Sequence, residues 1–415
     1  MPVYDDTAFL PVMEFALSSA AALAERVQRL QPSPTLAVTA RAAELKAQGH
    51  DIIGLGAGEP DFDTPEHIKE AAIRAIRAGQ TKYTAVGGTP ALKRAVMEKF
   101  RRENGLAYQA NQILVSCGGK QSFFNLCQAL LNRGDEAVIP APYWVSYPEI
   151  VAITGATPIM PYAGPEQHFK LSAAQLERAL TRRTRLLVIN SPSNPTGMLY
   201  SHAELAAFGE VLRRHPQVFI ATDDMYEHLL WQGGPFCNIL TACPDLYDRT
   251  LVLNGVSKAY AMTGWRIGYA GGPAWLIAAM TNVQSQSTSN PASISQAAAE
   301  AALTGDQRCV GEMCRAYQER HAFVYQRLRG MHAVRVLPVD GTFYSFPDLS
   351  AVIAKLQLAD DNALAERLLN DAGIALVAGS SFGAPGHLRL SFATSMANLE
   401  AAMNRLENFL RQAFA

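Results

Sequence analysis

The chain has 415 residues, 49% of them hydrophobic, which is more than a single hydrophobic core usually serves. We therefore expect two subdomains around a shared cleft. The formal net charge is −1, from 36 Lys and Arg against 37 Asp and Glu, and this balance argues against nucleic acid or an anionic membrane as a broad electrostatic partner.

The N-terminal segment, residues 8–24, is moderately apolar but contains Glu14 and has no basic leader. We expect no signal peptide there, and no later run is long enough to cross a bilayer. The six cysteines include no Cys-x-x-Cys pair, so we expect a reduced, cytoplasmic protein without a bound metal. Residues 1–24 are interpreted as an N-terminal extension.

From about residue 65 to residue 300, short apolar runs alternate with amphipathic stretches. Seven runs are bounded by Gly, Pro or polar residues and are typical of buried strands: Ile113–Ser116, Glu136–Pro140, Thr157–Pro161, Arg185–Asn190, Gln217–Thr222, Thr250–Leu253 and Arg266–Ala270. Helices are predicted over Pro90–Glu103, Gln121–Asn132 and Ser201–Arg214, the last with Ser201 and Glu204 as a capping box. This α/β alternation predicts a mostly parallel sheet covered by helices on both faces.

After residue 305 the pattern changes. A long polar helix over Gln307–Arg329 is followed by a mixed segment that ends in an apolar run, Leu388–Phe392, and a final helix, Met396–Phe414. These elements predict a smaller α+β domain, which the helix and strand before residue 58 join across the cleft. The expected division is a large domain over residues 59–332 and a small domain from residues 25–58 and 333–415.

Polar residues follow several predicted strands directly, where open α/β sheets bind their ligands. Lys258 follows the strand at 250–253, although a lone lysine there is more often a surface residue. Asp223 and Asp224 end another apolar run, and a buried carboxylate there would keep a heteroaromatic nitrogen protonated. Taken alone, this pair of acids is more typical of a turn or a helix cap.

Three further segments have a functional and an ordinary interpretation. The turn at 190–197, with its Pro and Gly residues, could point the Asn194 amide inward or be simply a loop. Gly118 and Gly119 join a strand to a helix, a turn that suits a phosphate but is weak evidence by itself. Trp144 could stack on an aromatic cofactor, and core packing is its default role.

Together these motifs resemble those of the class I aminotransferases of pyridoxal 5'-phosphate (PLP) fold type I. Within that family the chain is similar to the bacterial subgroup that contains aspartate and aspartate/prephenate aminotransferases, from about Ala24 to the C-terminus. The motifs are Ala57–Phe62, Lys82-Tyr83, Gly118–Gln121, Pro142–Tyr147, Asn190–Gly197, Asp223–Tyr226, Ser257-Lys258, Thr263–Tyr269 and His387–Ser391. The resemblance implies a seven-stranded, mostly parallel sheet sandwiched by helices, with a smaller domain built from both termini.

The resemblance also implies roles for individual residues around PLP. Lys258 holds the cofactor covalently and shuttles a proton, Asp223 pairs with the pyridine nitrogen, and Asn194 and Tyr226 hydrogen-bond the phenolic oxygen. Trp144 stacks on the ring. The phosphate is bound by Gly119, the Lys120 backbone, Ser257 and Arg266, with Tyr83 from a second subunit. Of these residues, Lys258, Asp223 and Tyr226 are the expected catalytic groups.

For the substrate, the resemblance implies that Arg389 binds the α-carboxylate through its planar guanidinium. Gly58, Trp144 and Asn194 complete this subsite. The segment Val283–Asn290 has no arginine, the residue that animal-type aspartate aminotransferases place there for a distal carboxylate. In the bacterial subgroup a lysine and a small hydroxyl residue serve instead, and they match Lys120 and Thr35.

A second departure is Asn254-Gly255, where other members carry a serine that touches the phosphate, so Ser257 takes that contact or none does. The expected protein is a homodimeric aminotransferase that converts L-aspartate and 2-oxoglutarate to oxaloacetate and L-glutamate by a ping-pong mechanism. The alternatives are an aromatic, prephenate or broad-range aminotransferase, a PLP lyase on the same fold, and a non-enzymatic PLP-binding regulator. The absence of a DNA-binding extension and the presence of Lys258 with Arg389 argue against the regulator.

Overall fold

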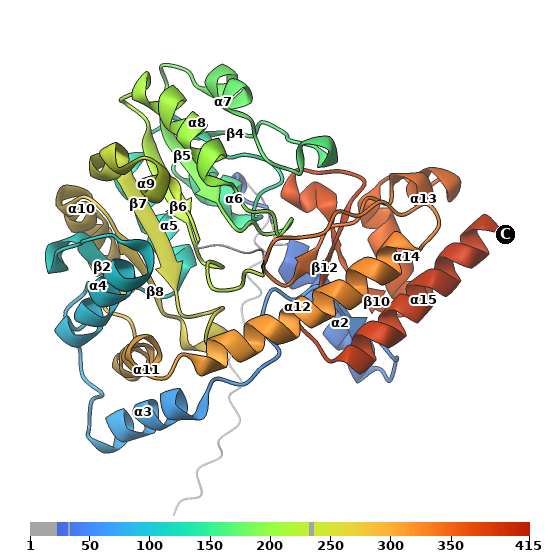
Figure 1. The fold of residues 1–415 in the computed structure, drawn as a ribbon, viewed down its shortest axis with the longest axis horizontal. Coiled ribbons are helices and arrows are strands. Elements are labelled where there is room, and N and C mark those ends of the chain that lie inside the picture. The colour runs from blue at the N-terminus through green and yellow to red at the C-terminus, as the bar shows by residue number, and fades with distance from the viewer. Residues whose placement is uncertain (1–22, 32–33, 232–235) are drawn as a thin grey trace, which may run out of the picture.

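The computed structural model describes residues 23–31, 34–231 and 236–415 (Figure 1). The expected N-terminal extension over residues 1–24 lies almost wholly outside this described part. Among the described residues, no helix combines the length and apolar character that crossing a membrane requires.

A seven-stranded sheet forms the centre of the larger part of the molecule. Its spatial order is β2 (Ile113–Ser116), β8 (Gly268–Gly271), β7 (Thr250–Gly255), β6 (Phe219–Asp223), β5 (Thr184–Asn190), β3 (Glu136–Val138) and β4 (Thr157–Ile159). β8 runs opposite to the other six strands, because it pairs antiparallel with both β2 and β7, and the pairs from β7 to β4 are all parallel. The predicted mostly parallel α/β sheet is therefore confirmed, and each predicted strand overlaps one of the seven.

Helices cover both faces of this sheet because its strands are apolar on both sides. In β5, Leu186 and Val188 belong to the hydrophobic cluster on one face, and Leu187 and Ile189 to the cluster on the other. The first face carries α5 (Gly119–Leu130), α6 (Ser146–Ile153) and α10 (Ala274–Ser285). The second carries α3 (Glu66–Arg77), α4 (Pro90–Asn104), α8 (His202–Arg213), α9 (Ile239–Ala242) and α11 (Ser293–Thr304), and α7 (Ala173–Ala179) packs on α8.

The helix termini follow the expected capping chemistry. Ser201 accepts a hydrogen bond from the Glu204 backbone N–H, and the Glu204 side chain returns to the Ser201 N–H, so the predicted capping box is present. α5 begins at Gly119, earlier than predicted, because Gly118 at its N-cap has φ 87°.

The second part of the molecule joins both ends of the described chain. Strand β1 (Ile53–Gly54) pairs in parallel with β10 (Ile374–Ala375), and β12 (Leu388–Ser391) lies between β11 (Val377–Ala378) and β9 (Tyr344–Ser345). The helices are α2 (Pro34–Ala47), α13 (Ser350–Lys355), α14 (Asp361–Ala372) and α15 (Met396–Phe414). The short helix α1 (Glu25–Gln28) instead contacts α6 of the larger part. In Figure 1 the blue α2 lies among the red C-terminal elements. The exact domain boundaries given above stay predictions.

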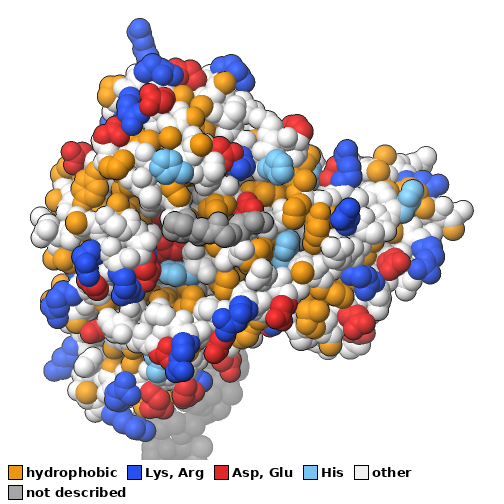
Figure 2. All heavy atoms as spheres, viewed as in Figure 1, with side chains coloured by type: hydrophobic (Ala, Val, Ile, Leu, Met, Phe, Trp, Pro, Cys, Tyr) orange, Lys and Arg blue, Asp and Glu red, His pale blue; other side chains and the backbone are white. Residues whose placement is uncertain are grey.

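Helix α12 (Arg308–Arg329) runs from the sheet to the C-terminal elements, as Figure 1 shows. Its buried residues Met313, Tyr317, Val324 and Leu328 belong to the core of the C-terminal part. This same cluster includes Tyr226 from the loop after β6, so the two parts share apolar packing beside the ends of the strands. On the surface, acidic and basic side chains are interspersed over the face seen in Figure 2.

Candidate active site

A cavity of about 450 Å³ opens where the carboxyl ends of β5, β6 and β7 face β12. Twelve of the thirteen site residues predicted from the sequence line it, although they come from distant parts of the chain. They are Thr35, Gly58, Gly119, Lys120, Trp144, Asn194, Asp223, Tyr226, Ser257, Lys258, Arg266 and Arg389.

Lys258 lies just after β7, where the strand delivers its side chain into the cavity. Its Nζ atom donates a hydrogen bond to the Gly58 carbonyl oxygen at 2.6 Å. Burial lowers the pKa of Lys258 to about 8, and the nearby cations Arg266 and Arg389 act in the same direction. A lysine in this setting gives up its proton far more readily than an exposed one, as a nucleophile or a base requires.

The two acids at the end of β6 have different surroundings. Asp223 lines the cavity, and its carboxylate accepts hydrogen bonds from Tyr147 Oη at 2.5 Å and from the Met225 N–H at 3.2 Å. Burial raises the pKa of Asp223, and the Tyr147 hydrogen bond opposes that rise. A cation placed beside this carboxylate would therefore be bound strongly.

Asp224 does not line the cavity. It is fully buried and accepts hydrogen bonds from Thr222 Oγ1 at 2.6 Å and from Asn238 Nδ2 at 2.7 Å. Burial, with the Glu227 charge nearby, raises the pKa of Asp224 to about 7. Because adjacent residues near a strand end point in opposite directions, only Asp223 is available to a ligand.

Arg389 is only 2% exposed, and β12 holds it at the opposite wall of the cavity. Its Nη1 donates to Asn194 Oδ1 at 2.9 Å and its Nη2 to the Gly56 carbonyl oxygen at 2.6 Å. Its Nε has no hydrogen-bond partner among the described residues. A buried guanidinium without a carboxylate partner favours an anionic ligand strongly.

One corner of the cavity suits a phosphate group. The N-terminus of the twelve-residue helix α5 meets the side chain of Arg266 there, and Ser257 lines the same cavity. A Cβ atom on Gly118 would lie 2.3 Å from an Arg266 Nη atom, and one on Gly119 would lie 2.6 Å from the Met225 side chain. The absence of a side chain at Gly118 thus lets the Arg266 guanidinium approach the α5 N-terminus closely, and this pair of positive groups fits the PLP phosphate that the resemblance implies.

Arg266 itself is placed differently from the prediction. The sequence predicts a strand from Arg266, but β8 begins at Gly268 and Arg266 follows a 3-10 turn at Thr263–Trp265 with φ 55°. Its Nη1 donates to the Thr263 carbonyl oxygen at 2.8 Å. This left-handed residue ends the turn and points its guanidinium at the α5 N-terminus instead of along the sheet.

Lys120 and Thr35 line the cavity from α5 and α2, respectively. The Lys120 Nζ lies 5.2 Å from the centre of the Trp144 ring, and Trp144 packs edge-on against Tyr147. Burial lowers the pKa of Lys120, and the Arg266 charge adds to this effect. Lys120 is therefore a cation that an acidic substrate could neutralise.

Tyr83 is the predicted site residue that does not line the cavity. Its side chain is 93% exposed, so within this chain it has no part in the site. The Asn254 side chain also turns away, because its Nδ2 donates to Glu227 Oε1 at 2.7 Å.

Two tyrosines in the site have no role in the interpretation of the sequence. Tyr147 appears there within a motif, and its hydrogen bond to Asp223 is visible only in the structure. Tyr344 has no local signal at all: it is a fully buried aromatic residue of β9 that lines the cavity and contacts Tyr226 through a 2.8 Å hydroxyl pair.

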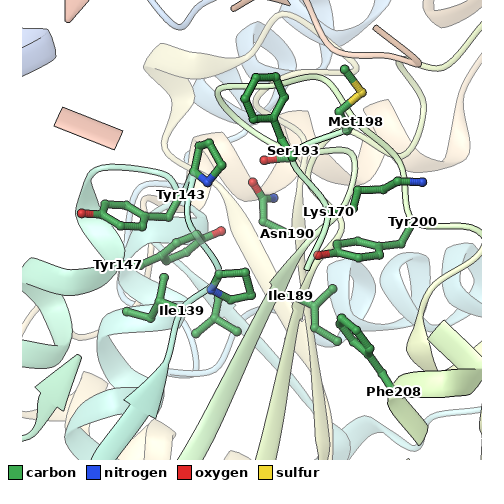
Figure 3. A pocket seen from close by; sticks show the side chains of 14 residues that line it. Ile139, Tyr143, Tyr147, Lys170, Ile189, Asn190, Ser193, Met198, Tyr200 and Phe208 are labelled. Carbon is green, nitrogen blue, oxygen red and sulfur yellow. The ribbon is translucent and has the colours of Figure 1, made fainter. Parts of the chain in front are cut away.

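A much smaller cavity of about 20 Å³ lies behind the main one, with room for about one water molecule (Figure 3). Tyr147 and Asn190 line both cavities. In Figure 3 the Asn190 amide lies between Tyr147 and Tyr200, and the Tyr200 hydroxyl accepts a hydrogen bond from the Leu171 N–H at 2.8 Å. The cavity behind Tyr147, the hydrogen-bond partner of Asp223, thus has a volume of only about 20 Å³.

A separate cluster of charged residues lies outside the main cavity and includes part of the loop after β6. Glu103, Glu227 and His228 have ligand atoms within 4.8 Å of one another. Lys99 is completely buried beside them and ion-pairs with both glutamates. Its ammonium already neutralises these carboxylates, which gives the group a structural role in joining α4 to the loop after β6.

Comparisons with known proteins show the family of this chain. A family model described as aminotransferase class I and II matches residues 50–406. The aspartate/prephenate aminotransferase of Nitrosomonas europaea is 59% identical over 394 residues, which are 94% of this chain and 99% of that relative. The aspartate aminotransferase of Geobacillus stearothermophilus is 48% identical over 390 residues, 94% and 98% of the two chains.

Solved structures give the same result for the fold. The aspartate aminotransferase from Rhizobium meliloti superposes with a TM-score of 0.89 at 47% identity and covers 93% of this chain and 98% of its own. The aspartate aminotransferase from Thermus thermophilus, solved with maleate, superposes with a TM-score of 0.88 at 44% identity, with 94% and 99% covered.

Proposed function

The chain belongs to the class I and II aminotransferase family, and we propose that this enzyme transfers the amino group of L-aspartate to 2-oxoglutarate with PLP as its cofactor. The observation that carries the proposal is the meeting of Lys258, Asp223 and Arg389 in one cavity of about 450 Å³. Relatives named aspartate aminotransferase or aspartate/prephenate aminotransferase, 46–59% identical over most of the chain, support the choice of aspartate.

The residues present fit PLP. When bound, PLP supplies an electron-withdrawing ring that stabilises the negative charge left at the substrate Cα after a proton is removed. Asp223, held by Tyr147, would keep the ring nitrogen protonated, and Trp144 would cover the ring face. Gly119, Ser257 and Arg266 would hold the phosphate, while Asn194 and Tyr226 would hold the phenolic oxygen.

Lys258 would carry the cofactor and then move the proton at Cα. Its pKa of about 8 leaves a substantial fraction of neutral amine near physiological pH, which suits a general base. The carbonyl oxygen of Gly58, 2.6 Å from Nζ, keeps the amine inside the cavity and close to the proposed substrate position.

Arg389 would bind the α-carboxylate. Both of its Nη atoms already donate to fixed acceptors, Asn194 Oδ1 and the Gly56 carbonyl, so the guanidinium plane is oriented before the substrate arrives. Its Nε, unpartnered among the described residues, and the second proton of each Nη provide further donors.

Lys120 and Thr35 would select acidic substrates. Both line the cavity, and the segment at 283–290 contributes no arginine that could replace them. Their place at the rim would put the distal carboxylate of aspartate near the Lys120 ammonium.

Prephenate is a second candidate as amino acceptor. Relatives 53–59% identical are named aspartate/prephenate aminotransferase. A further cavity of about 460 Å³ adjoins the site at Lys120, Val145 and Ser146, and is lined largely by apolar and aromatic residues such as Phe124 and Tyr143. This space would accept a substrate larger than aspartate.

We also propose a homodimer that works in the cytoplasm. Tyr83 would complete the phosphate site of the second subunit, and burial in that interface would explain why this aromatic residue is 93% exposed in the single chain. All six cysteines are free, as expected in a reducing compartment. Sedimentation analysis tests the dimer, and Tyr83→Phe tests the contact, because it should raise the PLP dissociation constant in a dimer but cannot do so in a monomer.

A half-reaction screen tests the proposed activity. The absorbance of bound PLP is followed as each amino acid is added alone to the purified holoenzyme. Aspartate and glutamate are expected to change the spectrum rapidly, and alanine and phenylalanine slowly. Equal rates for all four would contradict the acidic-substrate assignment, and release of ammonia instead of amino transfer would indicate a lyase.

A further inference from the structure

Tyr344 is buried and yet lines the main cavity. It lies in β9, which pairs with β12 so that Tyr344 is opposite Ser391, two residues from Arg389. Its hydroxyl also limits the space at Gly58, because a Cβ atom there would lie 2.7 Å from the Tyr344 Oη. Tyr344 is thus held by the sheet at the point where both walls of the site meet.

The hydroxyl of Tyr344 lies 2.8 Å from that of Tyr226, with the two rings at 73°. Each hydroxyl has a single proton to donate. If Tyr226 donates its proton to the phenolic oxygen of the cofactor, it must accept the proton of Tyr344. The geometry therefore defines a directed chain from Tyr344 to Tyr226 to the cofactor.

The ring of Tyr344 faces the guanidinium of Arg389, whose Cζ lies 4.5 Å from the ring centre. Phe382 also faces the guanidinium, at 4.9 Å. A cation over the face of a phenol attracts its electrons and makes its hydroxyl a better donor. In keeping with this, the Arg389 charge acts to lower the pKa of both Tyr344 and Tyr226, against the opposing effect of burial.

We propose that Tyr344 is a positioning residue that connects the two halves of the site: its ring holds the carboxylate-binding Arg389, and its hydroxyl orients Tyr226 toward the cofactor. The inference rests on the proposed function, since it assigns Arg389 to the substrate and Tyr226 to PLP. It predicts that removing the hydroxyl and removing the ring have separable effects.

The experiment compares three holoenzyme variants. Tyr344→Phe removes the hydroxyl and keeps the ring, and Tyr344→Leu removes both. Tyr317→Phe is the matched control, because Tyr317 is a fully buried tyrosine of the same hydrophobic cluster that does not line the cavity. Three quantities are measured: the PLP dissociation constant, the pH midpoint of the bound cofactor's absorbance, and the dissociation constant of maleate, an unreactive dicarboxylate.

For Tyr344→Phe we expect PLP to bind about two- to tenfold more weakly, as the loss of one hydrogen bond implies. The absorbance midpoint should move to higher pH, because a poorly oriented Tyr226 withdraws less charge from the phenolic oxygen. Maleate affinity should stay within about twofold of wild type, since the ring still faces Arg389. Tyr344→Leu should in addition weaken maleate about two- to thirtyfold. Tyr317→Phe should leave all three quantities unchanged.

A double variant isolates the hydroxyl pair. If Tyr344 acts through Tyr226, then Tyr344→Phe has no further effect on PLP binding or on the absorbance midpoint in a Tyr226→Phe background. Additive effects would overturn the inference, and so would a Tyr344→Phe protein indistinguishable from wild type in both cofactor measurements. Failure of the wild-type protein to bind PLP at all would instead overturn the proposed function.

Discussion

The Nζ atom of Lys258 and the carbonyl oxygen of Gly58 are joined by a 2.6 Å hydrogen bond across 200 residues of sequence. This contact links the end of β7 to the segment that follows β1. It therefore connects two walls of the cavity, which both residues line. The hydrogen bond orients the Lys258 amine within the cavity, while burial and then the nearby cations Arg266 and Arg389 lower its pKa.

Lys258→Ala is expected to abolish turnover, because Lys120 is the only other lysine that lines the cavity in the described part of the chain, and its ammonium faces the Trp144 ring. PLP should still bind noncovalently through the phosphate and pyridinium contacts. Absorbance spectra and equilibrium dialysis measure the binding, and a coupled assay measures turnover. Transamination close to the wild-type rate in this variant would rule out the assignment.

The lowered pKa of Lys258 predicts a selective reactivity in the cofactor-free protein. A lysine reacts with acylating reagents only as the neutral amine, so reaction at Lys258 should rise with pH and be half-maximal near pH 8. Surface peptides of the same protein serve as the control, because an unperturbed lysine amine reacts half-maximally only near pH 10.4. Competitive acetylation read by mass spectrometry measures both; identical profiles would show that Lys258 is not perturbed.

Asp223 and Asp224 form a matched pair for testing the ring-nitrogen contact. Asp223→Ala should weaken PLP binding and slow Cα deprotonation, because the cavity loses the carboxylate that keeps the ring nitrogen protonated. Asp224→Asn should leave PLP affinity near wild type, since that side chain points to Thr222 and Asn238. Fluorescence titration of PLP measures the difference. A larger loss from Asp224→Asn than from Asp223→Ala would reverse the roles.

Arg389→Lys should raise the Michaelis constant for every amino acid by a similar factor. The bidentate guanidinium contact is worth about 2–4 kcal/mol in a dry site, and lysine cannot reproduce its planar geometry. Steady-state kinetics with aspartate, glutamate and alanine provide the test. An effect confined to one substrate would mean that Arg389 reads the side chain and not the α-carboxylate.

Lys120→Ser separates acidic from neutral substrates. A partly screened charge pair is worth roughly 1–3 kcal/mol, so kcat/KM for aspartate and glutamate should fall about ten- to a hundredfold, with little change for alanine and phenylalanine. Serine keeps the backbone N–H at the start of α5, so PLP affinity should stay close to wild type. Equal losses for aspartate and phenylalanine would favour a broad-range aminotransferase.

The sequence by itself determined the sheet. The seven runs are short, continuously apolar and bounded by Gly, Pro or polar residues, a pattern typical of strands covered by helices on both faces. The motifs at the strand ends also identified the residues that line the cavity, because parallel strands deliver their carboxyl ends to one edge and the resemblance supplied the partners from the termini. The error at Arg266 was local: nothing in the sequence distinguishes a left-handed arginine from the first residue of the next strand.

Only the tertiary structure decided which neighbouring groups form hydrogen bonds with those residues and shift their pKa values. Asp223 and Asp224 are adjacent in sequence, but Tyr147 donates a hydrogen bond to the first and Asn238 to the second, so their side chains have different surroundings. Tyr344 lies 118 residues from Tyr226, whose hydroxyl it contacts, and it belongs to none of the motifs recognised in the sequence. Sequence spacing reports the periodicity of a local element, whereas hydrogen bonds and pKa values depend on groups that only the packing of distant elements brings within 3 Å.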